Sequence, residues 1–410
     1  MMFGQVISVV MQGVYFAILA RLLGATDYGI FAGAFAFTNL AAQYSTLGSG
    51  PIFILYVSGN KPGFAVYWGN ILFLTLTFGG VMVAVLTVLG HYILNPGSAA
   101  LVIFAAIANC LCATLSTETG RVFQTFERMR TTAILNMSTN VARTLTAGGM
   151  LLTLHKATAF QWAFASTVVS ALAAIAGVTC VTLTFGKPQI FPILFPKHGL
   201  EGFGHAIAGS TSNFYNDLDK TMLSHYGMNH ANGIYTVAYR IIDIATMPIY
   251  SIRDAAMPRI FQRGQTQGIS ASAELARKLM RRTIPLGALL TTGTFLVAPL
   301  ITIVVGKGYS ESVSALRWLA LLPLFRSYHQ MTGSAMTGAG FQRFRTGSQL
   351  SAALLNFGLN LFLIPAHGWL GAAWASLITD GGLALINATL LRFCILRYGK
   401  THKDTMQAVV

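Results

Sequence analysis

The chain has 410 residues, of which 54% are hydrophobic and only 10% carry a charge. Its mean hydropathy of +0.61 argues against a soluble domain and is typical of a multi-pass membrane protein. The net charge of +15 would suggest nucleic acid in a soluble protein, but most basic residues fall in short loops between apolar runs. That distribution follows the positive-inside rule, so we expect no nucleic-acid partner.

Apolar runs of about 20 residues, the length that crosses a bilayer as a helix, recur along the whole chain. Two of them are interrupted, the second at residues 48–51 and the tenth at Pro323. Such breaks are tolerated where neighbouring helices or a wet cavity satisfy the freed backbone groups. The twelve predicted spans are 3–23, 29–54, 64–89, 99–119, 132–153, 159–184, 204–225, 233–256, 283–305, 313–335, 347–366 and 371–391.

The basic residues predict the orientation of these spans. With the N-terminus inside, only Arg21, Lys156 and Lys307 fall in outer segments. The inner loops and the C-terminal tail hold Lys61, Arg121, Arg128, Arg130, Lys187, Lys197, Arg259, Arg263, Arg277, Lys278, Arg281, Arg282, Arg343, Arg345, Arg392, Arg397, Lys400 and Lys403. Because cytoplasmic loops carry the excess of Lys and Arg, we expect both termini in the cytoplasm.

A proline-rich stretch divides the spans six and six. We therefore predict an all-α polytopic membrane protein of about 12 transmembrane helices in two six-helix halves. The predicted parts are an N-terminal half (1–190), a cytoplasmic linker (191–203), a C-terminal half (204–392) and a cytoplasmic tail (393–410). The halves look related, because the first outer turn of each one ends in Gly-Ile-aromatic, at residues 29–31 and 233–235. Paired six-helix repeats are a transporter architecture in which substrate is handled between the halves.

Classical catalytic signatures are absent from the sequence. It has no Walker A sequence, no H-E-x-x-H, no G-x-S-x-G and no Rossmann fingerprint. No predicted outer loop is long enough for an enzymatic domain. We expect a protein that is not an enzyme, that uses no cofactor or metal, and that draws on an ion gradient or on the gradient of its own substrate.

Three deep charges stand out within the predicted spans. Arg143 lies about midway along the fifth span, too deep for its guanidinium to reach the interface easily. A guanidinium offers paired donors that suit a pyrophosphate, and the alternative is a buried ion pair with a neighbouring carboxylate. Arg326 and Asp380 are similarly deep in the tenth and twelfth spans, and they are predicted either to pair with each other or to line a cavity.

Five ionisable groups gather at the outer ends of the seventh and eighth spans. Asp217, Asp219 and Lys220 precede the turn, and Arg240 and Asp243 follow it on one helix face. The simplest arrangement pairs Asp219 with Arg240 and Lys220 with Asp243. Such a cluster would either gate the outer end as a structural element or contact substrate or a proton directly.

Two amides mark the eleventh span. Asn356 and Asn360 are four residues apart, so they lie on one face of an otherwise apolar helix. They are candidates for binding sugar hydroxyls, and the alternative is that they bond a neighbouring helix.

Three stretches resemble the polysaccharide transporter family of the multidrug/oligosaccharidyl-lipid/polysaccharide (MOP) flippase superfamily. They are ARLLGATDYGIF after the first span, NDLDKTMLSHYGMNHANGIYTVAYRI at spans seven and eight, and NLFLIPAHGWLGAAWASL at spans eleven and twelve. The resemblance implies flipping of an undecaprenyl-pyrophosphate-linked oligosaccharide across a bacterial inner membrane by alternating access. The implied partners are that substrate, membrane lipids and other glycan-assembly membrane proteins.

Two other functions compete with this interpretation. A cation-coupled exporter of the same superfamily would be expected to carry acidic residues deep in its first helices, and spans one to three contain none. A membrane glycosyltransferase or polymerase would need a large outer loop or a carboxylate-rich loop site, and the sequence offers neither. The flippase is the function that the sequence favours.

Overall fold

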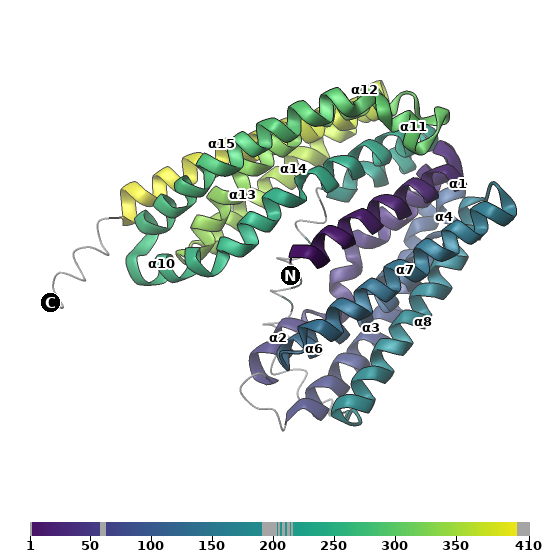
Figure 1. Ribbon diagram of the computed structural model, residues 1–410, viewed down its shortest axis with the longest axis horizontal. Helices are drawn as coiled ribbons and strands as arrows, with labels where there is room; N and C mark the ends of the chain where they lie inside the picture. The colour runs from purple at the N-terminus through teal and green to yellow at the C-terminus, as the bar shows by residue number, and fades with distance from the viewer. Residues whose placement is uncertain are drawn as a thin grey trace. The chain divides into compact units, whose positions relative to one another are not determined.

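The computed structural model describes residues 2–57, 63–190, 203, 206, 210, 214 and 216–399, and Figure 1 shows its helices. The described residues form helices joined by short turns, and none of them lies in a strand. The chain divides into two compact units, Met1–Gly233 (unit 1) and Ile234–Val410 (unit 2). The predicted linker at 191–203 lies outside the described residues, except for residue 203, and the predicted boundary of the halves stays a prediction.

Unit 1 contains a helix at each predicted span that falls within its described residues. The final described stretch before the next turn, residues 216–225, is also helical. The helices are α1 (Met2–Ala42), η1 (Gln43–Thr46), α2 (Ser49–Val57), α3 (Phe64–Ile93), α4 (Pro96–Ala99), α5 (Val102–Ala106), the π-helix η3 (Ile107–Ala113), α6 (Thr114–Thr125), α7 (Met129–Leu154) and α8 (Ala159–Phe185).

Two breaks in the helices of unit 1 fall at residues with positive φ angles. Gly24 (φ 69°) kinks α1 at the point where the sequence predicts the turn between spans one and two. Leu47 and Gly48, with φ of 48° and 71°, end η1 before α2 begins. The predicted interruption of the second span is therefore confirmed, and a left-handed glycine is the usual way to end a helix.

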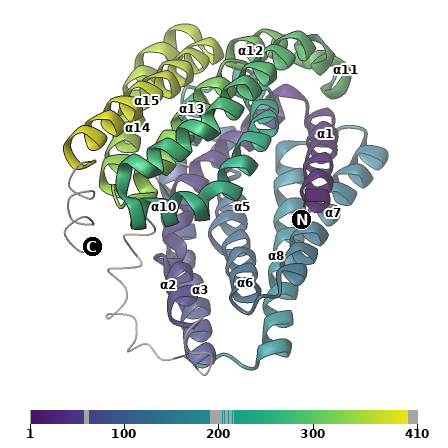
Figure 2. The same ribbon diagram turned by 60° about the vertical axis from the view of Figure 1, so that its left-hand side comes forward.

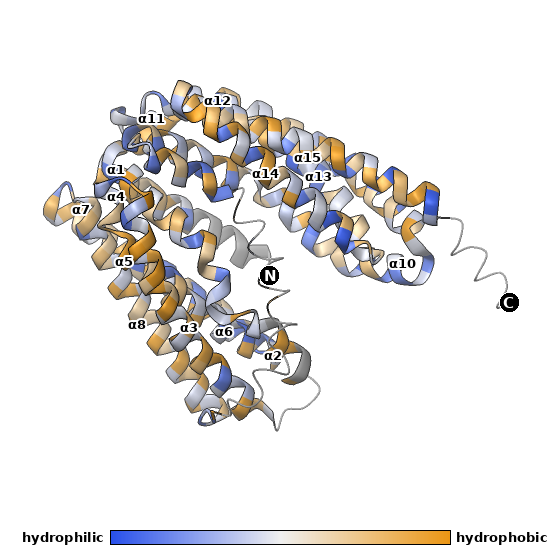
Figure 3. Ribbon diagram, turned by 180° about the vertical axis from the view of Figure 1, so that it is seen from behind, coloured by the Kyte–Doolittle hydropathy of each residue, from blue (hydrophilic) through white to orange (hydrophobic). Residues whose placement is uncertain are grey.

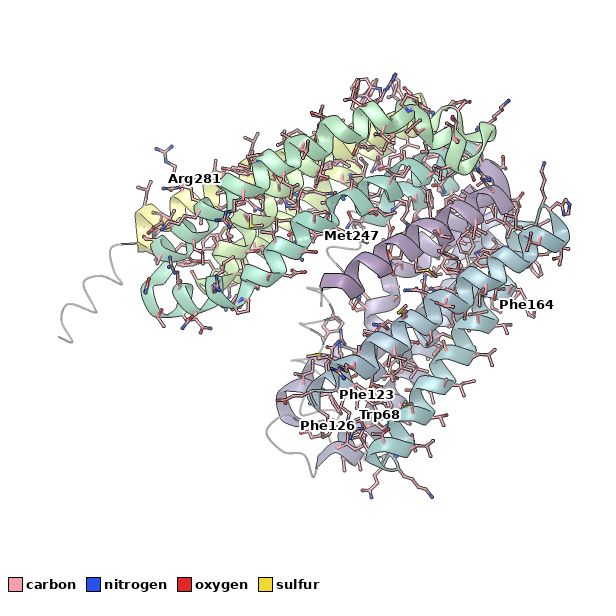
Figure 4. All side chains as sticks on the ribbon, viewed as in Figure 1. Trp68, Phe123, Phe126, Phe164, Met247 and Arg281 are labelled. Carbon is pink, nitrogen blue, oxygen red and sulfur yellow. The ribbon has the colours of Figure 1, made fainter. Side chains whose placement is uncertain are left out.

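The interior of unit 1 is built from large aromatic and aliphatic side chains. Trp68 of α3 and Phe123 of α6 are fully buried in one hydrophobic cluster, and Phe126 packs against it. Figure 4 labels these three side chains, together with Phe164 of α8, which is 55% exposed. Burying rings while leaving apolar residues on the outer surface suits a protein whose solvent is lipid.

The turn after residue 225 packs closely against α1 and the residues before α4. The Asn95 side chain donates to the Ser224 carbonyl at 2.6 Å, and Asn232 donates to the Gly29 carbonyl at 3.0 Å. A Cβ on Gly233 would lie 1.8 Å from the Ala25 carbonyl oxygen, and a Cβ on Gly29 would meet the start of α10 in the same way. The two Gly-Ile-aromatic turns therefore approach each other through their glycines.

Unit 2 is formed by one long, broken helix and the bundle that follows it. Gly268 (φ 79°) interrupts α10 (Asn229–Val297), which begins in unit 1 and spans the predicted inner loop 257–282 as helix. Figure 2 shows α13, α14 and α15 running side by side. The remaining elements are η5 (Ala298–Leu300), α11 (Ile301–Val305), η6 (Lys307–Tyr309), α12 (Ser312–Leu319), α13 (Leu322–Gly338), α14 (Gln342–His367) and α15 (Trp369–Tyr398). The break between α12 and α13 falls at the predicted Pro323 interruption.

Seven helices in the described part of the chain are long and apolar enough to cross a membrane. Two of them, at Met11–Thr46 and Asn229–Val305, contain more than one predicted span, because each continues as helix through a kink, at Gly24 and at Gly268. The helix α7, which carries Arg143, and the pair α12 and α13, which are short, are outside this set. Orange, apolar residues dominate most helices in Figure 3. The predicted class, an all-α polytopic membrane protein, is confirmed.

Candidate functional site

Arg143 lies near the middle of α7, partly exposed, with an incomplete set of partners. Its Nη2 donates to the Ser170 hydroxyl on α8 at 2.7 Å. Its Nε is buried and makes no hydrogen bond. Within the described ranges, no carboxylate forms an ion pair with this guanidinium. The buried ion pair that the sequence left open for Arg143 is thus not observed in the described residues, and its positive charge is available to an anion.

The residues that hold Arg143 orient it without neutralising it. The Ser170 hydroxyl donates to the Ser166 carbonyl at 2.6 Å, so its lone pairs are left to accept from the guanidinium. A helical serine that bonds back to its own helix is fixed in one rotamer. The hydroxyl therefore fixes one end of the guanidinium, while the charge that could bind an anionic group remains.

Within unit 1, the predicted outer cluster contains an ion pair between Lys220 and Asp217. The Lys220 ammonium lies 2.8 Å from an Asp217 oxygen, one turn away on the same helix. The other Asp217 oxygen accepts from the Asn39 side chain at 2.6 Å, which ties the pair to α1. Asp219 is fully buried and accepts the Lys220 backbone N–H at 2.7 Å. The carboxylates here are held by hydrogen bonds from two elements of one unit.

Unit 2 contains a buried charge network centred on Arg326 of α13. The guanidinium, 3% exposed, lies 3.0 Å from Asp243 on α10 and 3.5 Å from Asp380 on α15. It also donates to the Tyr239 hydroxyl at 2.6 Å. The predicted pairing of Arg326 with Asp380 is observed. The sequence predicts Lys220 as the partner of Asp243. Within unit 2, Asp243 pairs with Arg326.

His329 belongs to the same network and was not predicted as a site residue. Its Nε2 lies 3.3 Å from an Asp380 oxygen, yet both atoms are buried without an aligned hydrogen bond. His329 follows Arg326 by three residues, so both face α15 from one side of α13. This three-residue spacing from Arg326 is the sequence feature that could have identified His329. Among the described residues of this network, one arginine faces two carboxylates.

Glu118 on α6 is a second residue that sequence reasoning missed. It is 2% exposed, and one oxygen is paired with Arg121 three residues later. The other oxygen is buried without a hydrogen bond. A Cβ on Gly50 would come within 2.2 Å of that oxygen, so the first turn of α2 lies directly against the pair. The available signal was a single carboxylate in an apolar run, followed by an arginine on the same face.

Asn356 and Asn360 bond to each other and to a neighbouring helix. The Asn360 amide donates to the Asn356 oxygen at 2.9 Å, and Asn356 donates to Thr379 of α15 at 3.3 Å. Both side chains are buried. This is the helix-bonding alternative that the sequence left open, and the role of the two amides in binding sugar stays a prediction.

The pairs Asp219–Arg240 and Lys220–Asp243 would join the two units, and both stay predictions. Each unit contains an ion pair that the sequence did not predict. Lys220 has Asp217 at the i–3 position, and Asp243 has Arg326 on another helix. Arg240 lies on α10 one residue after Tyr239, and its predicted role in binding substrate is likewise untested.

Comparison with known proteins gives a family for most of the chain. Residues 1–264 match the family described as "Polysaccharide biosynthesis protein". An uncharacterized membrane protein of Methanocaldococcus jannaschii is 28% identical over 196 residues, which are 48% of this chain. The aligned part is 45% of that relative, so the match spans about half the length of the relative.

Solved structures share the fold at low sequence identity. An inward-facing multidrug resistance MATE family transporter of the MOP superfamily has a TM-score of 0.77 at 13% identity, covering 95% of this chain and 96% of its own. The lipid II flippase MurJ, in an inward closed conformation, has a TM-score of 0.68 at 12% identity, covering 95% and 87%. A MOP superfamily transporter from Pyrococcus furiosus has a TM-score of 0.65 at 13% identity, covering 96% and 93%. The chain thus has the fold of MOP superfamily transporters and flippases.

Proposed function

The chain belongs to the polysaccharide biosynthesis protein family, and from that premise we propose that it flips an undecaprenyl-pyrophosphate-linked oligosaccharide from the inner to the outer leaflet. We place it in a bacterial inner membrane with both termini in the cytoplasm, as its basic loops predict. The substrate would be a precursor of a surface polysaccharide or O-antigen. The two units would move by alternating access, which is the usual mechanism of transporters built from six-helix repeats.

One observation carries the proposal, an arginine in mid-helix that pairs with no carboxylate in the described part of the chain. An ionised side chain at membrane depth costs about 2.5–3.5 kcal/mol on insertion scales, so one that persists there needs a compensating partner. Arg326 has two carboxylates, whereas Arg143 has a hydroxyl and a buried Nε with no partner. A pyrophosphate would supply the missing acceptors, since a guanidinium binds phosphate oxygens through paired N–H donors.

The remaining site residues take supporting roles in this proposal. Lys220 and Arg240 would add positive charge for the pyrophosphate, and Asn356 and Asn360 would offer amides to sugar hydroxyls. Arg326 would add positive charge only after releasing Asp243 and Asp380. The carboxylates would gate the pathway or couple it to an ion by exchanging their partners between two arrangements. They are Asp217, Asp219, Asp243 and Asp380.

The test is export of the native glycan by Arg143 variants in a strain that lacks the chromosomal copy. Arg143→Lys should keep part of the export because the charge remains, and Arg143→Ala should lose it. Both should reach the membrane at normal levels, since no described carboxylate depends on this arginine. Arg130→Ala, an exposed arginine near the start of the same helix, is the matched control and should export normally.

Two results would overturn the proposal. Full export by a well-expressed Arg143→Ala variant would remove the residue from the site. Normal glycan export in the deletion strain, accompanied by lost resistance to cationic drugs, would favour the cation-coupled exporter of the same superfamily instead. A membrane-fraction blot beside each export measurement separates loss of function from loss of protein.

A further inference from the structure

A second polar feature lies on the surface of unit 2, between α10 and α12. It is a cavity of about 550 Å³ that we call the Arg317 groove. Its walls include Thr291, Phe295 and Leu296 from α10, and Ser314, Arg317 and Trp318 from α12. The groove therefore combines one cation and several hydroxyls with a mainly apolar lining, which is how sites for amphiphilic ligands are built.

Arg317 provides an unneutralised charge at the groove. Its guanidinium lies over the Phe295 ring, 5.2 Å from the ring centroid, in a cation–π contact. No carboxylate in the described part of unit 2 pairs with it. The nearest acid in sequence on α12's N-terminal side, Glu311, accepts from the Trp369 indole at 3.0 Å. A cation–π contact fixes the guanidinium without neutralising it, so its outer N–H groups stay available to an anion.

A buried hydroxyl in the groove wall is also without a partner. The Thr291 Oγ1 is inaccessible to solvent and makes no hydrogen bond, although helical threonines usually bond back to their own helix. A buried polar group without a partner is destabilising. A rotation of the Thr291 side chain about χ1 would bring this hydroxyl to an acceptor bound in the groove, and the observation is independent of the charge of Arg317.

The aromatic residues beside the groove place it at the level of lipid headgroups. Trp318 packs edge-on against Trp374 at 6.0 Å between centroids, and Trp369 begins α15 a turn and a half earlier. Tryptophans gather at membrane–water interfaces because their rings are amphipathic. Phe295 and Leu296 are 48% and 69% exposed, and they lie in the last turn of α10, where Phe295 packs against Arg317. An anion held at Arg317 would therefore have exposed apolar surface beside it for hydrocarbon chains.

We propose that the Arg317 groove binds a membrane phospholipid, with the phosphate held by Arg317 and the acyl chains along Phe295 and Leu296. A free phosphate ion would leave the apolar lining exposed, and a lipid without phosphate would leave Arg317 and Thr291 without an acceptor. The groove lies in unit 2, whereas Arg143 lies in unit 1. The inference is thus independent of the proposed function.

Native mass spectrometry of the full chain in detergent tests this site, with dioleoyl phosphatidylglycerol as the probe. Arg317→Gln should weaken its binding by about tenfold, because a charge-assisted contact to phosphate is lost. Arg317→Lys should retain part of it. Thr291→Val, which keeps the shape and removes the hydroxyl, should weaken it a few-fold. Arg259→Gln, an exposed arginine of α10 outside the groove, should bind like the unaltered chain.

Three outcomes would overturn the proposal. Equal binding of the phosphatidylglycerol by Arg317→Gln and the unaltered chain would remove Arg317 from the site. Equal binding of dioleoylglycerol, which has the same chains, would mean that phosphate is not recognised. Displacement of the lipid by millimolar inorganic phosphate alone would identify a site for the free ion. None of these outcomes depends on glycan export, so a failure here is separate from a failure of the proposed function.

Discussion

Removing Arg326 should destabilise unit 2 more than removing either acid that faces it. In Arg326→Leu, Asp380 would remain 4% exposed with only His329 beside it, and Asp243 and the Tyr239 hydroxyl would lose the same partner. Breaking a buried pair from one side costs about 3–5 kcal/mol, since an uncompensated charge is left behind. Asp380→Asn should cost less, because Arg326 keeps Asp243 at 3.0 Å.

Unfolding of the purified chain in mixed micelles measures these changes in a double-mutant cycle. Arg326→Leu combined with Asp380→Asn should be more stable than the sum of the single losses predicts, by about 0.5–3 kcal/mol. Arg277→Leu, an exposed arginine of α10, is the control and should change stability little. Strictly additive losses, or an Arg326→Leu variant as stable as the unaltered chain, would refute a network held by charge.

Two further predictions concern packing in unit 1 and the amides of α14. Gly233→Ala should lower stability by about 1–3 kcal/mol, because its Cβ would lie 1.8 Å from the Ala25 carbonyl oxygen, and thermal unfolding measures it. Gly148→Ala, with nothing within 4 Å of the new Cβ, should be neutral or stabilising, and an equal loss in both would contradict the packing argument. Asn360→Leu should cost only about 0.6 kcal/mol, the average for a polar contact between membrane helices, while leaving export intact if the amides are structural. Lost export at unchanged stability would show instead that they contact the sugar.

The sequence was sufficient for features that depend on one helix at a time. Apolar run length located the spans, and glycine and proline located the breaks at 48–51 and at Pro323. Spacing along a helix placed Asn356 and Asn360 on one face, and they do bond to each other. Each of these predictions depends only on the spacing of residues along one helix, which the sequence gives directly.

Partners on different helices depend on more than spacing along one helix: the pairing of Arg326 with Asp380 was predicted, whereas that of Arg326 with Asp243 was not. The choice between Lys220 and Arg326 as the partner of Asp243 depends on how α10 is rotated about its axis, and hydropathy does not determine that rotation. The burial of Glu118 depends on Gly50 bringing the backbone of α2 close to α6. A glycine allows such an approach, but nothing in the sequence says which residue it will face.

Arg143 and Arg326 show why a deep arginine in a membrane helix is not by itself a functional site. In the sequence the two are equivalent, since each interrupts an apolar span near its middle. In the structure Arg326 is enclosed by Asp243, Asp380 and a tyrosine hydroxyl, so its charge is balanced within the protein. Arg143 has a serine hydroxyl and an Nε without a partner. A balanced charge contributes to specific packing, whereas an unbalanced one is retained at a cost that a bound anion would offset. Among the described residues Arg143 has no carboxylate partner, and this absence, more than the arginine itself, favours it as the substrate-binding residue.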